Sequence, residues 1–512
     1  MRRATPASIT MAATICLLIA VTGLSACGGG GGGGSSSGGG SSSSSSSTGP
    51  EAGTLSAVDF DHQLKIKSAS SGQFLTITGA SQTAGAAISQ AVDGTGTELL
   101  WHAIPFVSNQ YNLENLLTHQ VAGIANASTS ADAAVVQWAD NGTNDHLWSF
   151  YKLKNGNYLI RNMNSGFYLQ ADGMTVTQGA RAASGNAQEW VLSPTNMAAY
   201  PMPATVSGTG VDVHDPDILI DPTGKAWLYG THNTLASSAD LSAFTKIAGG
   251  IFSLDFSWWA SKNTTGGNGR TDLWAPTVMY ANGKYYQYYS IPIYQTPSNS
   301  TTNNGAQAVI ALATSANPDG PWTDAGQIVE SCGKAVGCTT TFNAIDPAPF
   351  IDATGKWWMV FGSWEDGTHI IPLDHATGLR QGADIFSVAK RDAGEEGPFI
   401  FPWIVGGTQY YYYFASINVC CKADSPYHII VGRSTSPTGP YLDHGGLDLR
   451  DGGGTILLSA HDNIRGPGGQ SVFVSGGQVK IVYHYYDSNS NGAPKLGINT
   501  LGFDTDGWPV VQ

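Results

Sequence analysis

The chain has 512 residues, of which 12% are charged and 10% are aromatic, and its 24 basic and 38 acidic residues give a formal net charge of −14. This balance argues against a nucleic-acid backbone or an anionic membrane surface as the main partner, and it suits a neutral ligand such as a polysaccharide. The 65 glycines and the many aromatic residues favour short strands joined by tight turns, so we expect an all-β protein with two folded domains.

Residues 1–27 have the character of a lipoprotein signal peptide. Two arginines at positions 2 and 3 precede an apolar run over residues 11–21, which is too short to span a membrane. The run ends in LSAC at residues 24–27, which resembles a bacterial lipobox. The resemblance implies cleavage before Cys27 and lipidation of its sulfur, with the exported protein anchored at the cell surface or outer membrane. The alternative is an ordinary signal peptide with a chance cysteine, which gives a secreted protein.

Residues 28–55 are predicted to be a flexible linker. Up to about residue 48 this stretch is almost pure Gly and Ser, a composition with nothing to bury and no preferred conformation. It would tether the folded part of the chain to its anchor.

Residues 56–195 contain a threefold internal repeat. A glutamine precedes a tryptophan in each unit, and the tryptophans Trp101, Trp148 and Trp190 are separated by 47 and 42 residues. An apolar patch lies upstream of each tryptophan, at residues 74–75, 121–122 and 167–169. The pattern resembles the ricin-type β-trefoil, whose repeat ends in Gln-x-Trp, although only residues 188–190 keep that motif in full. Carbohydrate binding and a spacer without ligand both stay open for this domain.

Residues 205–512 carry a longer, more degenerate repeat. Five times an apolar strand is followed by a polar turn and by a second strand that is rich in aromatic residues. Lys225, Lys284, Lys356 and Lys480 mark four of the turns, and residues 406–409 form the fifth. The second strands are predicted at residues 226–230, 285–290, 357–363, 410–416 and 479–486. Five small sheets close most economically as a five-bladed β-propeller.

Three acids occupy matching places in this repeat. Asp215 lies ten residues before Lys225, Asp346 lies ten residues before Lys356, and Glu396 opens the fourth unit in the sequence EEGP. Innermost propeller strands line one channel, so we expect the three carboxylates to cluster there. Glycoside hydrolysis requires one carboxylic acid to protonate the leaving oxygen and one carboxylate on the other side of the sugar. Each acid taken alone has a plainer explanation, because Asp before Pro often caps a turn.

Five motifs make the resemblance specific: VHDP at 213–216, LWAP at 273–276, NAIDP at 343–347, FGSW at 361–364 and EGPF at 396–399. They resemble glycoside hydrolase family 43, and within it the arabinan endo-1,5-α-L-arabinosidases, over essentially all of residues 205–512. The resemblance implies an inverting mechanism, with Asp215 as general base, Glu396 as general acid and Asp346 as the residue that orients Glu396 and raises its pKa. Glu395 is the rival for the acid, but the family motif places the acid directly before Gly-Pro.

The same motifs suggest contacts with the substrate. Trp274 is expected to stack on a furanose ring, or else to pack between blades. Asn343, Ser363 and His214 are candidate hydrogen-bonding partners of the sugar hydroxyls.

A cation, usually calcium, is implied by the resemblance of blade five to arabinanases that hold one through a histidine and several waters. His461 is the candidate ligand. Calcium itself prefers oxygen ligands, and other arabinanases carry Gly-Pro-Gly-His where this chain has Gly469.

Four cysteines lie beyond the leader. Cys332 and Cys338 bracket a Gly-rich loop and could close a disulfide in an oxidising compartment. Cys420 and Cys421 are adjacent, so they form either a vicinal bridge or two buried thiols. Paired cysteines also follow this strand in arabinanases, which implies a supporting role near the site.

Alternative functions also remain. Family 43 contains β-xylosidases and α-L-arabinofuranosidases with the same three acids, and a cell-surface protein that binds sugar without cleaving it is a different class altogether. We expect a monomer that acts on arabinan in pectin, binds no nucleic acid, uses no organic cofactor and meets the membrane only through Cys27.

Overall fold

The computed structural model describes residues 50–262, 269–293, 307–332 and 339–512. The signal peptide, Cys27 and nearly all of the Gly/Ser linker lie outside the described residues. Within them the fold is almost entirely β, as predicted; α1 (Trp259–Lys262) is the single α-helix among them, beside several 3-10 turns. None of the helices found there has the length and apolar character that crossing a membrane requires.

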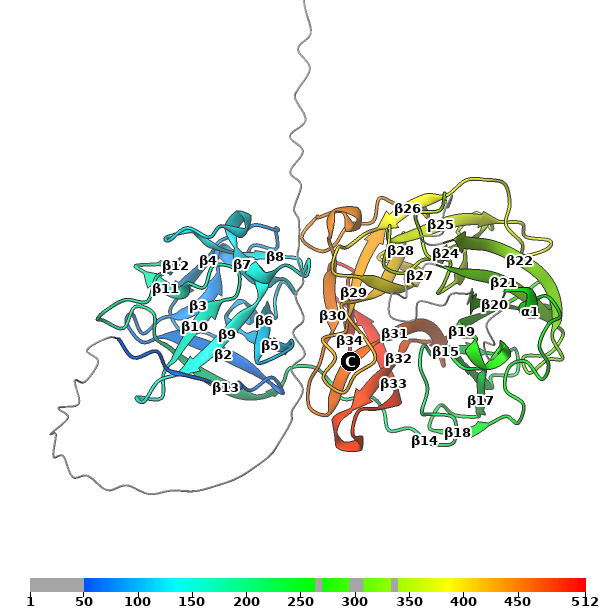
Figure 1. The fold of residues 1–512 in the computed structure, drawn as a ribbon, viewed down its shortest axis with the longest axis horizontal. Coiled ribbons are helices and arrows are strands. Elements are labelled where there is room, and N and C mark those ends of the chain that lie inside the picture. The colour runs from blue at the N-terminus through cyan, green and yellow to red at the C-terminus, as the bar shows by residue number, and fades with distance from the viewer. Residues whose placement is uncertain (1–49, 263–268, 294–306, 333–338) are drawn as a thin grey trace, which may run out of the picture. The chain divides into compact units, whose positions relative to one another are not determined.

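The first domain is a 13-stranded antiparallel sheet that folds into the predicted β-trefoil (Figure 1). Its strands are β1 (Thr54–Leu55), β2 (His62–Ser68), β3 (Phe74–Ile77), β4 (Ile88–Ala91), β5 (Trp101–Pro105), β6 (Gln110–Asn115), β7 (Val121–Ile124), β8 (Val135–Trp138), β9 (Trp148–Lys152), β10 (Tyr158–Asn162), β11 (Tyr168–Asp172), β12 (Thr175–Gly179) and β13 (Trp190–Ala198).

The three repeat tryptophans explain why this sequence folds with threefold symmetry. Each side chain is fully buried in one shared core, and each indole N–H donates to a main-chain carbonyl in the apolar patch upstream. The bonds join Trp101 to Leu75 (3.0 Å), Trp148 to Ala122 (2.9 Å) and Trp190 to Leu169 (3.0 Å). All three units therefore bury the large ring and satisfy its N–H in the same way. This shared packing explains why each unit keeps its tryptophan even where the other residues of Gln-x-Trp differ.

The second domain has five antiparallel sheets, one for each predicted repeat (Figure 1). Blade one contains β15 (Asp217–Ile220), β16 (Ala226–Gly230), β17 (Thr234–Ser238) and β18 (Ala243–Lys246), with β14 (Ser207–Gly208) added in parallel to β18. The other blades are β19 (Trp274–Ala281), β20 (Lys284–Pro292), β21 (Gln307–Ser315) and β22 (Thr323–Cys332); β23 (Ala348–Ile351), β24 (Trp357–Phe361), β25 (Thr368–Leu373) and β26 (Phe386–Ala389); β27 (Glu395–Val405), β28 (Thr408–Ile417), β29 (His428–Ser434) and β30 (Thr455–Leu458); and β31 (Ile464–Ser475), β32 (Gln478–Asp487), β33 (Ala493–Phe503) and β34 (Pro509–Val511).

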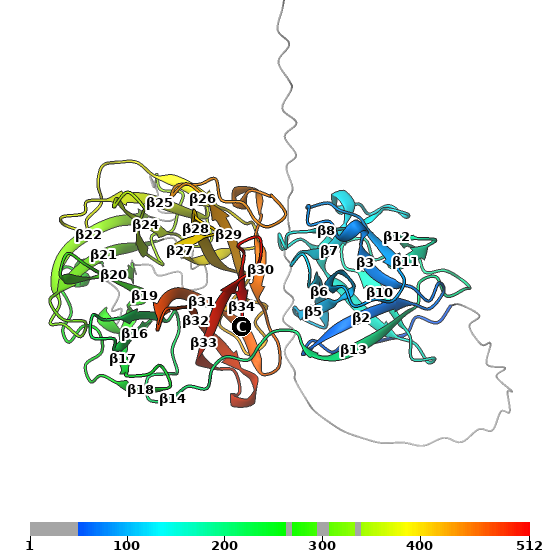
Figure 2. The ribbon, with the colours of Figure 1, turned by 180° about the vertical axis from the view of Figure 1, so that it is seen from behind.

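The blades close into a ring. Figure 2 shows this ring of blades from behind. The first strands β15, β19, β23, β27 and β31 contact one another in that order, and β31 also contacts β15. The five-bladed propeller is therefore confirmed, and the predicted second strands correspond to β16, β20, β24, β28 and β32. Residues at the start of the first strands come from distant parts of the sequence and meet around one channel.

The lysines that marked the turns have a structural reason to be there. In blades one, two and three the ammonium group lies over the aromatic ring two residues further along the second strand. The distances from Nζ to the ring centroid are 4.1 Å for Lys225 and Trp227, 5.0 Å for Lys284 and Tyr286, and 3.8 Å for Lys356 and Trp358. Each ring is buried in the core, and the lysine above it stabilises the hairpin by a cation–π contact.

Candidate active site

A cavity of about 520 Å³ opens where the first strands of the blades begin. Asp215, Asp346 and Glu396 all line it, although 181 residue positions separate the first from the last. The structure thus brings together the three acids that the repeat pattern predicted.

The backbone explains how two of the acids reach equivalent places. At the entry to the first strand, each blade has a residue with a positive φ: Asp215 (48°), Ala275 (39°), Asp346 (57°), Gly397 (61°) and Gly469 (56°). In the first four blades this residue directly precedes a proline. A left-handed conformation is unfavourable for Asp and Ala, so it is a local strain that the propeller holds in place at the site. The acids of blades one and three occupy this position, whereas Glu396 lies one residue before it.

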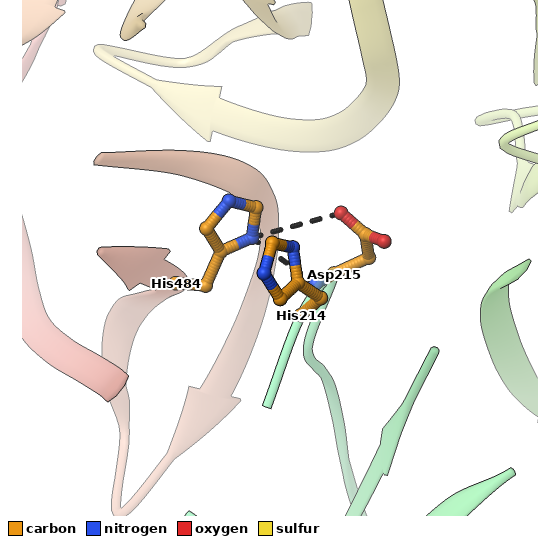
Figure 3. A group of neighbouring side chains, drawn as sticks. All are labelled: His214, Asp215 and His484. Carbon is orange, nitrogen blue, oxygen red and sulfur yellow. Dashed lines mark hydrogen bonds and ion pairs between the residues drawn. The ribbon is translucent and has the colours of Figure 1, made fainter. Parts of the chain in front are cut away.

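Asp215 is held from both sides. The hydroxyl of Thr231 donates to its Oδ2 at 2.5 Å, and its own backbone N–H donates to Nδ1 of His484 at 3.1 Å. Figure 3 shows the rings of His214 and His484 next to this carboxylate. Its side chain is about 31% exposed, which leaves it accessible from the cavity.

The tautomer of His484 follows from these bonds. Because Nδ1 accepts the N–H of Asp215, the ring proton is on Nε2, which donates to the hydroxyl of Tyr486 at 3.0 Å. Burial, together with nearby His214 and against the opposing effect of Asp215, lowers the pKa of His484 to about 3. His484 is therefore neutral across the working pH range of most enzymes and acts here as a fixed hydrogen-bonding link.

Asp346 and Glu396 form a tightly coupled pair. Burial raises the pKa of Asp346 well above its usual value, and the carboxylates of Glu396 and Asp215 raise it further. The backbone N–H of Gly397 donates to Asp346 Oδ2 at 2.9 Å, so the loop that carries Glu396 is bound directly by Asp346. Burial is also the main cause that raises the pKa of Glu396. A proton is retained on this pair well above the pH at which an ordinary carboxylic acid loses it.

Three donors surround Glu396. Its Oε2 accepts from the Ser363 hydroxyl at 3.2 Å and from the Trp364 indole at 3.1 Å, and the Tyr427 hydroxyl also bonds to the carboxyl group. All three bonds favour the charged form and partly offset the effect of burial. Glu395, the rival for the acid, is 1% exposed, bonds to the Tyr413 hydroxyl and does not line the cavity.

The predicted substrate contacts divide into two groups. Trp274 and His214 line the cavity, and both are partly exposed. Ser363 is buried behind Glu396 and touches the acid instead of the open space. Asn343 is 4% exposed and is not among the residues that line the cavity, so its assignment as a direct sugar contact does not fit the structure.

His461 is also placed away from the cavity. It is fully buried, its Nδ1 lies 2.8 Å from the Ser459 carbonyl, and its ring centroid is 5.7 Å from that of Tyr200. The only histidines among the described residues that line the cavity are His214, His232 and His484. His461 lies in the loop before β31 and does not line this cavity, and its role as ligand of a channel cation stays a prediction.

The cavity itself offers a different set of ligands for a cation. Ligand atoms of His214, Asp215 and His484 all lie within 4.8 Å of one another (Figure 3). Nδ1 of His484 is already used by the Asp215 amide, which leaves one carboxylate and His214 as ready ligands. Calcium takes six to eight oxygens, so these side chains fit it only if water fills most of the coordination shell.

Several residues of the site were not identified from sequence. Thr231, Tyr427 and His484 lie in no motif that signals catalysis, and Trp364 was noted only as part of FGSW. The alternation of β32 would have placed His484 inward had the register of the bulged hairpin been known.

The two adjacent cysteines form a disulfide, Cys420–Cys421, and both line the cavity. Of the two arrangements open from sequence, the structure thus has the bridge. Cys332 is disulfide-bonded as well, while Cys338 lies outside the described residues.

Comparison with known proteins agrees with this geometry. Residues 212–509 match the model of the glycosyl hydrolases family 43, and residues 57–138, 99–183 and 143–217 match the ricin-type β-trefoil lectin domain-like model. The chain is 35% identical over 321 residues to an extracellular endo-α-(1→5)-L-arabinanase of Bacillus subtilis, covering 61% of this chain and 92% of that protein. It is 34% identical over 315 residues to an extracellular exo-α-(1→5)-L-arabinofuranosidase of Cellvibrio japonicus, covering 59% and 87%.

The solved structures include an α-L-arabinanase of Cellvibrio cellulosa complexed with arabinohexaose. It is 31% identical, with a TM-score of 0.51, over 59% of this chain and 96% of that one. The family model matches more than half of the chain and includes all three acids of the cavity. The protein therefore belongs to the glycosyl hydrolases of family 43 and is a glycoside hydrolase with a ricin-type β-trefoil domain ahead of its propeller.

Proposed function

We propose that this protein hydrolyses the α-1,5-L-arabinofuranosidic bonds of arabinan with inversion at the anomeric carbon. The observation that carries the proposal is the clustering of Asp215, Asp346 and Glu396 in one cavity, where burial raises the pKa of Asp346 and of Glu396. The relatives named above act on α-1,5-linked arabinose according to their names, which supports this substrate over a xyloside.

The proposed general acid is Glu396. Burial raises its pKa, which favours the protonated form that an acid requires, and the donors from Ser363, Trp364 and Tyr427 fix its orientation. The proton passes to the glycosidic oxygen as the bond from that oxygen to the anomeric carbon breaks.

The proposed general base is Asp215. Held by Thr231 and by its own backbone bond to His484, its carboxylate takes a proton from a water molecule, which attacks the anomeric carbon from the opposite face. Inversion requires roughly 6.5 to 9.5 Å between the two carboxyl groups, so that the water fits. At the end of one cycle Glu396 is charged and Asp215 is protonated, and exchange with solvent restores both.

Asp346 is the proposed positioning residue for the acid. Its bond to the Gly397 amide fixes the backbone next to Glu396, and the coupling of the two carboxyl groups disfavours a charge on both at once. Trp274, which lines the cavity and is half-exposed, is proposed to stack on a furanose ring.

A channel calcium ion stays a prediction. We expect any such ion in this cavity to be held by Asp215, His214 and water, and no step of the mechanism above depends on it. Metal analysis of the purified protein, compared with His214→Ala, tests this: calcium retained equally by the variant would exclude the proposed ligand.

Export is supported by the names of two relatives, which describe extracellular proteins. Lipidation at Cys27, a monomeric state and sugar binding by the trefoil are further predictions. Metabolic labelling with a palmitate analogue, lost in Cys27→Ser, would test the anchor.

The decisive experiment compares linear α-1,5-arabinan with an aryl β-xyloside and an aryl α-L-arabinofuranoside as substrates. Release of arabinose or its oligomers from arabinan, with the first product anomer inverted by proton NMR, supports the proposal. Cleavage of an aryl glycoside without attack on arabinan would leave the family intact but change the substrate, and a retained anomer would exclude the roles given to Asp215 and Glu396.

A further inference from the structure

The Cys420–Cys421 disulfide forms part of the wall of the catalytic cavity, and the mechanism above gives it no task. Both cysteines line the same space as Asp215 and Glu396. Cys420 is half-buried and Cys421 is exposed, so the bridge is accessible to a molecule in the cavity.

The loop that carries the bridge is anchored to its surroundings by hydrogen bonds. The Asn418 N–H donates to the Gly394 carbonyl at 3.3 Å, and the Ser425 hydroxyl donates to the Val419 carbonyl at 2.6 Å. These bonds fix both ends of the loop, and a bridge between adjacent residues closes a small ring that leaves the two side chains no free rotation. The surface is therefore formed before any ligand binds.

The surface that the bridge presents is apolar. The Cys421 N–H donates to the Tyr486 hydroxyl at 2.9 Å, so this amide is not offered to the cavity, and the side chains of the pair offer it sulfur and methylene. A sulfur surface is polarisable and makes favourable contacts with flat or weakly polar groups.

A furanose ring has a matching face. Its hydroxyl groups suit the carboxylates and other polar side chains of the site, while its C–H bonds need an apolar contact. We propose that the Cys420–Cys421 disulfide is a substrate-binding element, whose sulfur and methylene surface contacts the C–H face of a pentofuranosyl ring held beside Asp215 and Glu396. This inference rests on the proposed arabinan hydrolysis.

A role of the same bridge in positioning the general base predicts different kinetics. Cys421 is joined through Tyr486 and His484 to the backbone of Asp215, so the loop could act by positioning the general base. A positioning element would change kcat, whereas a ring contact present in the bound substrate changes KM and affinity. Tyr486→Phe cuts the positioning chain but leaves the disulfide in place.

The experiment uses the exported chain with Cys420→Ser/Cys421→Ser, and Cys332→Ser/Cys338→Ser as the matched control. We expect KM for arabinan to rise about tenfold in the first variant, the scale of one lost apolar contact in a sugar pocket, with kcat within about threefold of wild type. The affinity of an arabinose oligomer, measured by calorimetry in the Glu396→Gln background, should fall by the same factor. Neither change is expected in the control or in Tyr486→Phe.

Two outcomes would overturn the inference: unchanged KM and oligomer affinity, or a fall in kcat at constant KM that Tyr486→Phe reproduces. If the Cys420→Ser/Cys421→Ser variant does not fold, the Cys332→Ser/Cys338→Ser protein is reduced and its KM and oligomer affinity are measured instead. In that protein the pair Cys420 and Cys421 is the one remaining disulfide of the exported chain, so reduction breaks this bridge alone. A wild-type protein that never cleaves arabinan contradicts the proposed function, whereas normal wild-type turnover with an unaffected serine variant contradicts this inference alone.

Discussion

Removal of the Ser363 hydroxyl should move the pH profile of the enzyme in a direction that the structure fixes. Ser363 is 2% exposed, its Oγ donates to Glu396 Oε2 at 3.2 Å, and it does not line the cavity. Ser363→Ala therefore removes one donor to the acid and leaves the residues that line the cavity unchanged. The hydroxyl stabilises the charged carboxylate, so its loss raises the pKa of Glu396.

The magnitude follows from the strength of one such bond. A hydrogen bond of this length to a partly buried carboxylate contributes about 1 kcal/mol, and about 1.4 kcal/mol corresponds to one pKa unit. The alkaline limb of kcat/KM, which reports the general acid of the free enzyme, should therefore move up by about 0.7 pH unit. Trp364→Phe, which removes the indole donor at 3.1 Å, should move it in the same direction.

The assay is the rate of arabinan hydrolysis at low substrate concentration over the pH range of stability. Ser290→Ala is a matched control, because the hydroxyl of this buried serine has no hydrogen-bond partner among the described residues, so its removal should leave the limb in place. An alkaline limb that stays fixed in Ser363→Ala, or moves to lower pH, would refute the claim that Glu396 is the general acid and that the Ser363 hydroxyl lowers its pKa.

Three further changes test the geometry. Gly469→Ala places a Cβ 2.5 Å from Asp215 Oδ1 at a φ of 56°, so kcat should fall about 100-fold or more. Gly283→Ala is the control: its φ of 75° is equally strained, but nothing lies within 4 Å of the new Cβ, so activity should be kept. Equal losses of kcat in the two variants would contradict the steric argument. Thr231→Val removes the hydroxyl bonded to Asp215 and should lower kcat about tenfold with little change in KM. Thr231→Ser keeps a hydroxyl and should keep kcat near that of wild type. A serine variant as slow as the valine variant would contradict the role of this hydroxyl in holding Asp215. Trp148→Ala should lower the free energy of unfolding of the trefoil by about 3–5 kcal/mol in denaturant titrations, and a loss below about 1 kcal/mol would show that the threefold core does not depend on this ring.

The architecture was predictable because its signals repeat. Each trefoil unit buries a tryptophan whose N–H needs a carbonyl, and each early blade places a lysine over an aromatic ring, so equivalent residues recur at nearly constant spacing. The two Asp-Pro acids follow the same logic, because Asp215 and Asp346 share one strained backbone position.

The surroundings of the acids were not predictable in the same way. His484 lies on β32 and His461 in the loop before β31, and only His484 of the two lines the cavity, which their places in the sequence do not reveal. Thr231 lies between β16 and β17 and Tyr427 lies just before β29, and each bonds to an acid elsewhere in the sequence, so no local pattern marks them. Asn343 adjoins a catalytic motif but faces the interior, because position next to a motif does not fix the direction of a side chain.

The most direct test of the central claim is arabinan turnover by Glu396→Gln beside Glu395→Gln. The two residues are adjacent, yet Glu396 lines the cavity and Glu395 is buried against Tyr413. The account predicts that wild type releases short arabinose oligomers or arabinose, that Glu396→Gln loses about 100-fold or more in kcat, and that folded Glu395→Gln keeps most of the rate. Comparable turnover by wild type and Glu396→Gln, with the loss found in Glu395→Gln instead, would contradict it.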